Sequence, residues 1–276
     1  MFAGLKGGAT LPPGTVLGKD FLAAAPLRGG LYASIWTRSE GLAMHDQAAA
    51  KATPALPDYT QGPRQRLAVE EVGRVWRLDR AGDMEAIWEN MSREEFGEDE
   101  RMPYWAELWP ASLLLCRWLS RNRETVRGRH CLDVGCGLGL TGIVGSWLGA
   151  MVVGMDHQWP AVYFSRENAE LNAVAQPLWV QMDWGSPGFK PGSFDFMWGG
   201  DIVYETRFYH PLTKLFKEYL APGGRIWLAE PRRSVSRPVW DRLASDGFNV
   251  RKLFTEPVPV EGYHVTVNLW EMTLPD

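Results

Sequence analysis

The chain of 276 residues is poor in cysteine and lacks any long apolar run. Its three cysteines, Cys116, Cys131 and Cys136, have neither the spacing of a metal site nor an obvious pairing. This usage favours a reduced, cytoplasmic protein over a disulfide scaffold. No apolar stretch approaches the roughly 20 residues that cross a bilayer, so we expect no membrane-spanning helix. Gly, Pro and Lys interrupt residues 1–22, and we expect no signal peptide there.

An excess of basic residues is also absent. The net charge is −4 and the isoelectric point is about 5.8. A protein with this balance has no general affinity for nucleic-acid phosphates, although a local basic patch would still allow an RNA substrate. Hydrophobic residues make up 45% of the chain, which is enough for a full core.

The chain divides near residue 63. Residues 1–63 are rich in Gly, Ala and Pro and show no sustained period, so we expect a flexible or weakly structured extension. Residues 64–276 are predicted to form one domain, with a lid or strand segment over 64–110 and a core over 111–276. Within the first segment, residues 67–78 suggest one or two short strands, and Asp83 is predicted to cap a short helix.

Strands and helices alternate through the core. The patterns predict strands near 129–134, 151–155, 178–182, 194–198 and 225–229, with helices over 140–148, 159–173, 208–220 and 234–246. Such alternation predicts a Rossmann-like, doubly wound α/β sheet. Two consecutive strands, near 248–254 and 263–270, then predict a C-terminal antiparallel hairpin and seven strands in all.

The most informative motif is Cys-Leu-Asp-Val-Gly-Cys-Gly-Leu-Gly-Leu-Thr-Gly over 131–142. A strand, a glycine turn and a helix N-terminus let a ligand approach bare backbone and unpaired N–H groups. Residues 137–142 also spell GxGxxG, a weak dinucleotide signal on its own. Asp133 would repel a pyrophosphate but suits a ligand that carries an ammonium group, such as S-adenosylmethionine. A purely structural glycine turn is the alternative.

Further polar residues follow the later strands. Asp156 ends the second strand of the core, where a carboxylate can accept both ribose hydroxyls, although NAD enzymes use the same contact. After the third strand, Asp183 and Trp184 are placed to read the amine and stack on the ring of an adenine. A helix cap or an exposed carboxylate is the structural alternative for Asp156.

The fourth strand closes with Gly199-Gly200-Asp201-Ile-Val-Tyr204. The glycines permit close approach of a ligand at the switch point between the first and fourth strands. Asp201 and Tyr204 are three residues apart and would project into the same mouth. The alternative is a helix cap with a packed tyrosine.

Together, these motifs and Pro103-Tyr-Trp-Ala-Glu-Leu-Trp-Pro110 resemble the seven-β-strand protein lysine methyltransferases that share an Asp-x-x-Tyr motif. That group includes enzymes acting on the electron-transfer flavoprotein β-subunit, on chaperones and on valosin-containing protein, and the Trp–Pro segment is most similar to the flavoprotein branch. The resemblance covers about 103–273. Its implied cofactor positions, with Asp133 and Asp183 added by the reasoning above, are Trp109, Asp133, Gly135, Cys136, Gly137, Asp156, Asp183, Trp184 and Gly200.

The resemblance implies S-adenosylmethionine as cofactor, a protein substrate and Asp201 and Tyr204 at the acceptor site. Our hypothesis is that Asp201 orients a lysine amine while Tyr204 shapes an aromatic wall. No metal is required. Three alternatives stay open: methylation of a small amine, a cofactor-binding protein without turnover, and an NAD oxidoreductase that rests on GxGxxG and Asp156 alone.

Overall fold

The structure is a computed structural model that describes residues 59–82, 103–232, 237–260 and 262–275. The predicted extension over 1–63 lies almost wholly outside these residues, as does the short helix predicted after Asp83. The described part of the domain starts with a strand at Arg64, next to the predicted boundary. Within the described ranges, no helix combines the length and the apolar character needed to cross a membrane.

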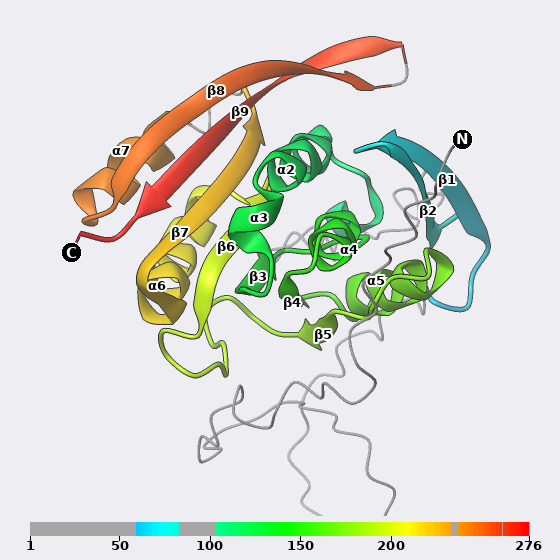
Figure 1. Cartoon of the computed structure of the whole chain (residues 1–276), viewed down its shortest axis with the longest axis horizontal. Coiled ribbons are helices and arrows are strands. Elements are labelled where there is room, and N and C mark those ends of the chain that lie inside the picture. Colours follow the sequence, from blue (N-terminus) through cyan, green and yellow to red (C-terminus); the bar gives the residue numbers. More distant parts are fainter. Residues whose placement is uncertain (1–58, 83–102, 233–236, 261, 276) are drawn as a thin grey trace, which may run out of the picture.

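A seven-stranded sheet forms the centre of the molecule, in the order β5-β4-β3-β6-β7-β9-β8 (Figure 1). The first five of these strands are parallel, and β9 and β8 are antiparallel to their neighbours. The predicted doubly wound sheet with a C-terminal hairpin is therefore confirmed. The strands are β3 (His130–Val134), β4 (Met151–Asp156), β5 (Leu178–Gln181), β6 (Phe194–Gly200), β7 (Leu220–Pro231), β8 (Asn249–Val260) and β9 (Tyr263–Thr273).

Helices cover both faces of the sheet (Figure 1). Side chains alternate along each strand: Cys131 and Trp198 belong to the core under α2 and α4, whereas Leu132 and Met197 belong to the core under α6 and α7. This period of two explains why the strands read as continuous apolar runs. The helices are α2 (Pro110–Arg121), α3 (Arg123–Val126), α4 (Leu140–Trp147), α5 (Trp159–Leu171), α6 (Tyr209–Tyr219) and α7 (Arg237–Ser245).

A separate antiparallel hairpin precedes the core. Its strands, β1 (Arg64–Glu71) and β2 (Arg74–Ala81), form their own two-stranded sheet. The hairpin packs on α5, and a third small core joins it to the 3-10 turn η2 (Tyr104–Ala106) through Ala81, Trp105, Leu138 and Phe164. The predicted strands over 67–78 are thus one hairpin fixed to the body of the domain.

The last strands are longer than the sequence pattern predicted. We predicted an end near residue 254 for β8, but the strand continues through Pro257 and Pro259 to Val260. The carbonyl of Thr266 accepts a hydrogen bond from the backbone N–H of Arg232. The Thr266 backbone therefore bonds to the β7 side and not to β8. Its partner in β8, Pro257, is in a non-hydrogen-bonded pair, so the Pro257 nitrogen faces the free edge of the sheet. Pro259, two residues further on, faces the same edge.

Candidate functional site

The glycine loop joins β3 to α4. Gly135, Gly137 and Gly139 have φ of +68°, +52° and +84°, a region that glycine enters at little cost. A Cβ on Gly135 would lie 2.9 Å from Cγ2 of Ile202 and 3.3 Å from Cζ2 of Trp184. The loop at the switch point between β3 and β6 therefore requires glycine at this position, because neighbouring side chains already fill the space of a Cβ; its contact with a ligand stays a prediction.

Asp133 faces the start of α4. Its side chain is buried, and the Thr141 hydroxyl donates a hydrogen bond of 2.7 Å to its Oδ2 atom, joined by the backbone N–H of Gly142. Burial raises the pKa of this carboxyl to about 7. In this geometry the carboxylate fixes the helix N-terminus; its predicted contact with a ligand ammonium stays a prediction.

Asp156 lies at the carboxyl end of β4 and touches the glycine loop. Its two oxygens accept the backbone N–H groups of Gly137 and Gln158, each at 3.0 Å. Burial raises the pKa of this carboxyl. Each carboxylate oxygen has a second lone pair, so the same group can still accept a ligand hydroxyl.

Asp183 and Trp184 follow β5 but point to different surroundings. The Asp183 carboxylate is exposed, accepts the Gly185 N–H at 2.6 Å and lies 3.9 Å from His157. The indole of Trp184 turns inward over Gly135. Its Nε1–H is buried and has no acceptor within the described part of the chain. An orphaned indole N–H beside bare glycine backbone is the kind of feature that a bound ligand satisfies.

Asp201 begins the loop after β6 in a strained conformation. Its φ is +57°, one of three positive values among the described non-glycine residues, and its side chain is 6% exposed. The Asp201 N–H donates to the carbonyl of Ala229 over 2.7 Å. Just before it, a Cβ on Gly200 would meet the Ser112 Oγ at 2.9 Å, so β6 ends against the N-terminus of α2. Strain of this kind accumulates at functional sites.

Five aromatic side chains form a continuous aromatic row through the site. Neighbouring ring centroids lie 6.0, 5.2, 5.4 and 5.1 Å apart, all in edge-to-face contact. In order, the members are Trp109, Tyr104, Tyr204, Phe208 and Trp184. Phe208 ends the 3-10 turn η3 (Thr206–Phe208). The row runs from the cap of α2 to the glycine loop.

A hydrogen bond fixes the position of one member of the aromatic row, Trp109, and burial fixes the protonation state of another, Tyr204. The Trp109 Nε1–H donates to the carbonyl of Tyr104 over 2.9 Å, which ties the helix cap to η2. Burial raises the pKa of Tyr204, and the charge of Glu205 adds to the effect. Tyr204 therefore remains a neutral phenol across the physiological range.

The structure brings most of the predicted residues together. Trp184 covers Gly135, Asp156 holds Gly137, and the aromatic row links Trp109 to Tyr204. Cys136 is buried, with its thiol 3.5 Å from the Ser165 hydroxyl, and burial raises its thiol pKa far above the ordinary value. Sequence reasoning treated Tyr104 only as part of a covering segment and missed Phe208, since both act through ring contacts made in space.

A metal site and a further pocket were also sought in the described residues. The described residues contain no group of three or more His, Cys, Asp or Glu side chains arranged to hold a metal ion. A pocket of ≈ 420 Å³ opens between α7 and the β7–β9–β8 part of the sheet, with Glu230 and Trp270 in its lining. It shares no lining residue with the glycine loop or the aromatic row.

Comparison with known proteins gives consistent results. A family model described as "Lysine methyltransferase" matches residues 93–241. The chain is 35% identical over 105 residues to the protein N-lysine methyltransferase METTL21A of Mus musculus, covering 36% of this chain and 48% of that relative. It is 35% identical over 127 residues to the electron transfer flavoprotein beta subunit lysine methyltransferase of Danio rerio, covering 46% and 44%. The matches thus span about half the length of these curated relatives.

Solved structures show the same fold. A magnesium protoporphyrin IX methyltransferase from Synechocystis with bound SAH aligns with a TM-score of 0.50 and 15% identity, covering 68% of this chain and 100% of that chain. A 16S rRNA methyltransferase of T. thermophilus, in complex with AdoMet and guanosine, aligns with a TM-score of 0.50 and 20% identity, covering 74% and 50%. At these identities the likeness concerns the fold alone.

Proposed function

The chain belongs to the lysine methyltransferase family, and from this premise we propose that it methylates lysine side chains of a protein with S-adenosylmethionine as methyl donor. One observation supports this best: the aromatic row joins the strained Asp201 loop to the bare backbone of the glycine loop. A cationic acceptor and a nucleoside-bearing donor would then meet at one edge of the sheet.

The residues fit the donor. The glycine loop offers backbone without side chains, Asp156 offers carboxylate oxygens at the end of β4, and Trp184 offers an unpaired indole N–H and a ring beside Gly135. In this proposal Gly135 and Gly137 contact the methionine part, Asp156 the ribose, and Trp184 the adenine. When bound, S-adenosylmethionine supplies an electrophilic methyl group on a sulfonium.

The acceptor amine must lose a proton before its lone pair can form the new N–C bond; the S–CH3 bond of the donor would break in the same step, and the donor would leave as its neutral thioether. A free lysine has a pKa near 10.4, and a dry pocket beside a positive charge lowers that value. The aromatic row presents ring faces that attract a cation. Asp201 accepts a hydrogen bond from the amine and aims its lone pair along the line of transfer. The proton leaves to solvent, and the Tyr204 phenol stays neutral throughout.

The proposal assigns a protein, not a small amine, as the substrate. The named relatives are protein methyltransferases, and two of their names specify a protein substrate, the electron transfer flavoprotein beta subunit and EEF1A. The three free cysteines are buried, which fits action in the cytoplasm. Microscopy of the tagged chain tests that location.

The deciding experiment uses methyl-labelled S-adenosylmethionine and a lysate of cells that lack this gene, separated into protein, RNA and small-molecule fractions. We expect one discrete labelled protein, with the label on lysine. Asp201→Asn should slow labelling by on the order of 100-fold, because orientation of the acceptor is lost. Glu205→Gln, which removes a charge from the same loop, is the matched control and should label normally.

Each outcome has a definite meaning. Label confined to small molecules would contradict the protein substrate and favour amine methylation. Full turnover by both Asp201→Asn and Tyr204→Ala, with intact cofactor binding, would show that the acceptor site is wrongly assigned. Protection from thermal unfolding by NAD in place of S-adenosylhomocysteine would overturn the choice of cofactor.

A further inference from the structure

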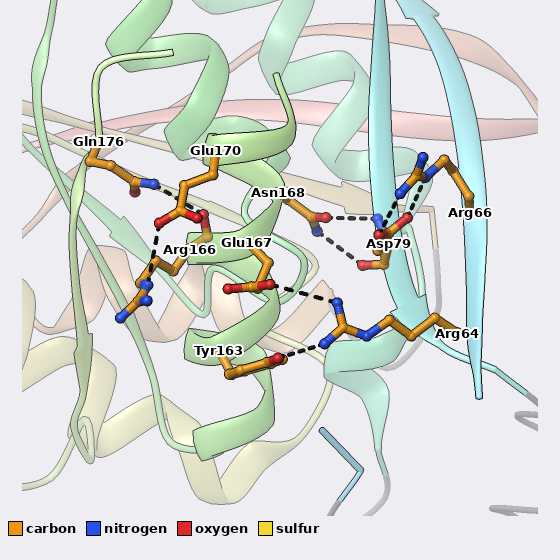
Figure 2. Close-up of polar contacts among 9 residues, drawn as sticks. All are labelled: Arg64, Arg66, Asp79, Tyr163, Arg166, Glu167, Asn168, Glu170 and Gln176. Atoms are coloured by element: carbon orange, nitrogen blue, oxygen red, sulfur yellow. Dashed lines mark hydrogen bonds and ion pairs between the residues drawn. The ribbon is translucent and has the colours of Figure 1, made fainter. Parts of the chain in front are cut away.

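Two asparagines, Asn168 in α5 and Asn172 at its C-cap, hydrogen-bond the backbone of β2. Asn168 accepts the N–H of Asp79 over 2.7 Å and donates to the carbonyl of Asp79 over 3.0 Å (Figure 2). One helical turn later, Asn172 accepts the N–H of Arg77 over 2.9 Å and donates to its carbonyl over 2.6 Å. Each amide thus pairs with one residue of the strand as a neighbouring strand would.

Asn168 makes one bond that Asn172 does not. Its second amide hydrogen is donated to the carbonyl of Leu138, inside the glycine loop, over 3.0 Å. The neighbouring carbonyl of Gly137 accepts the hydroxyl of Ser165, one turn earlier on α5, over 2.9 Å. Two successive carbonyls of the loop are therefore fixed by α5. The second amide hydrogen of Asn172 goes instead to the carbonyl of Asn168, within the helix.

Burial makes these bonds consequential. The side chains of Ser165 and Asn168 are fully buried, and Asn172 is 4% exposed. Without Asn168, the buried Leu138 carbonyl would lose the side-chain donor that it has among the described residues. Leaving a buried acceptor unpaired ordinarily costs more than the net worth of an exposed hydrogen bond. A shift of Leu138 would also move the preceding residue, Gly137, whose N–H donates to Asp156.

Surface pairs between the hairpin and α5 cannot replace this link. Arg64 donates to the Tyr163 hydroxyl and pairs with Glu167 at 3.6 Å, but these side chains lie near the surface (Figure 2). Such exposed pairs contribute little and touch no residue of the glycine loop. Asn168 hydrogen-bonds both the hairpin and the glycine loop, whereas the small core of Ala81, Trp105, Leu138 and Phe164 joins them by apolar packing alone.

We propose that Asn168 is a positioning residue that couples docking of the β1–β2 hairpin to the shape of the glycine loop, and so to donor affinity. The hairpin then supports the shape of the glycine loop and does not act as a mobile cover. The consequence for affinity rests on the proposed function; the coupling itself does not.

The test compares Asn168→Ala with Asn172→Ala in the full chain. Both variants lose the paired contacts to β2, but only Asn168→Ala loses the contact to Leu138. Hydrogen exchange without added ligand is measured in peptides covering 64–82 and 135–142, and affinity for S-adenosylhomocysteine is measured by calorimetry. Asn168→Ser provides a milder variant if the alanine variant folds poorly.

We expect both variants to exchange faster in the hairpin, whereas only the Asn168 variants exchange faster in the loop and bind S-adenosylhomocysteine about 10-fold more weakly. Unchanged loop exchange in Asn168→Ala, or equal loop opening in Asn172→Ala, would overturn the proposal. If the unaltered chain fails to bind S-adenosylhomocysteine, the proposed function fails, and the exchange data still decide the coupling.

Discussion

The two halves of the candidate site are built from different materials. On the β3–β4 side, buried polar groups hold backbone: Asp133 fixes the start of α4, Asp156 holds Gly137, and Asn168 holds Leu138. On the β6 side, the aromatic row provides ring faces, and the loop after β6 contributes a buried acidic residue, Asp201.

The difference follows from what each half must recognise. A loop that binds through its own backbone needs that backbone held in one shape, and buried hydrogen bonds do this best. A cationic acceptor needs an environment that is dry and still attractive to positive charge, which ring faces provide. Variants in the first half should therefore alter donor binding or stability, and variants of Asp201 and Tyr204 in the second should alter turnover.

The strongest test of this division is Tyr204. Tyr204→Ala removes the central ring of the aromatic row, and we expect turnover to fall by about 10- to 50-fold, in line with the ~2 kcal/mol of a desolvated cation–aromatic contact. Steady-state kinetics with a saturating donor measure the loss. Tyr204→Phe keeps the ring and should retain most of the activity. An equal loss of S-adenosylhomocysteine affinity in Tyr204→Ala would break the division.

A smaller effect is expected at Gly135. Gly135→Ala places a Cβ at positive φ and 2.9 Å from Ile202, a backbone cost of about 1–2 kcal/mol before any contact is counted. We expect roughly 10-fold weaker binding of S-adenosylhomocysteine in calorimetry, together with a lower melting temperature. Gly188→Ala is the control, because a Cβ there meets nothing within 4 Å. Identical affinities for the two variants would contradict the predicted approach of the donor to this backbone.

The smallest effect concerns pH. Because burial raises the pKa of Asp133 to about 7, the folded state keeps a proton that the unfolded state releases at lower pH. This group therefore lowers stability as pH rises from about 4 to 7, and Asn at this position does not titrate. The melting temperature of Asp133→Asn, relative to the unaltered chain, should rise by on the order of 5 °C between pH 5 and pH 8. A difference independent of pH would show that Asp133 titrates normally.

Much of the fold could be predicted from local pattern. The Asp133-to-Gly142 motif gave the strand, the turn and the helix, because each of these depends on neighbours in sequence. The end of β8 could not be placed, since a run containing Pro257 and Pro259 ordinarily stops a strand. Only the position of β8 at the edge of the sheet makes these prolines acceptable.

The site was predicted less completely, for a related reason. Residues after each parallel strand, such as Asp156 and Asp201, could be placed at one edge because topology alone brings them there. The contacts of Tyr104, Phe208 and Asn168 depend on how η2, η3 and α5 pack against the glycine loop. Sequence spacing also could not show that Asp133 would turn toward Thr141.

The outward prolines of β8 also bear on how copies of this protein behave together. An edge strand normally presents a row of amide donors, and another chain can add to it as a further strand. Pro257 and Pro259 have no amide hydrogen to present, so this edge lacks two successive donors on its open side. Even at high concentration, the protein should therefore resist strand-to-strand association at the β8 edge, and with it the formation of fibrils.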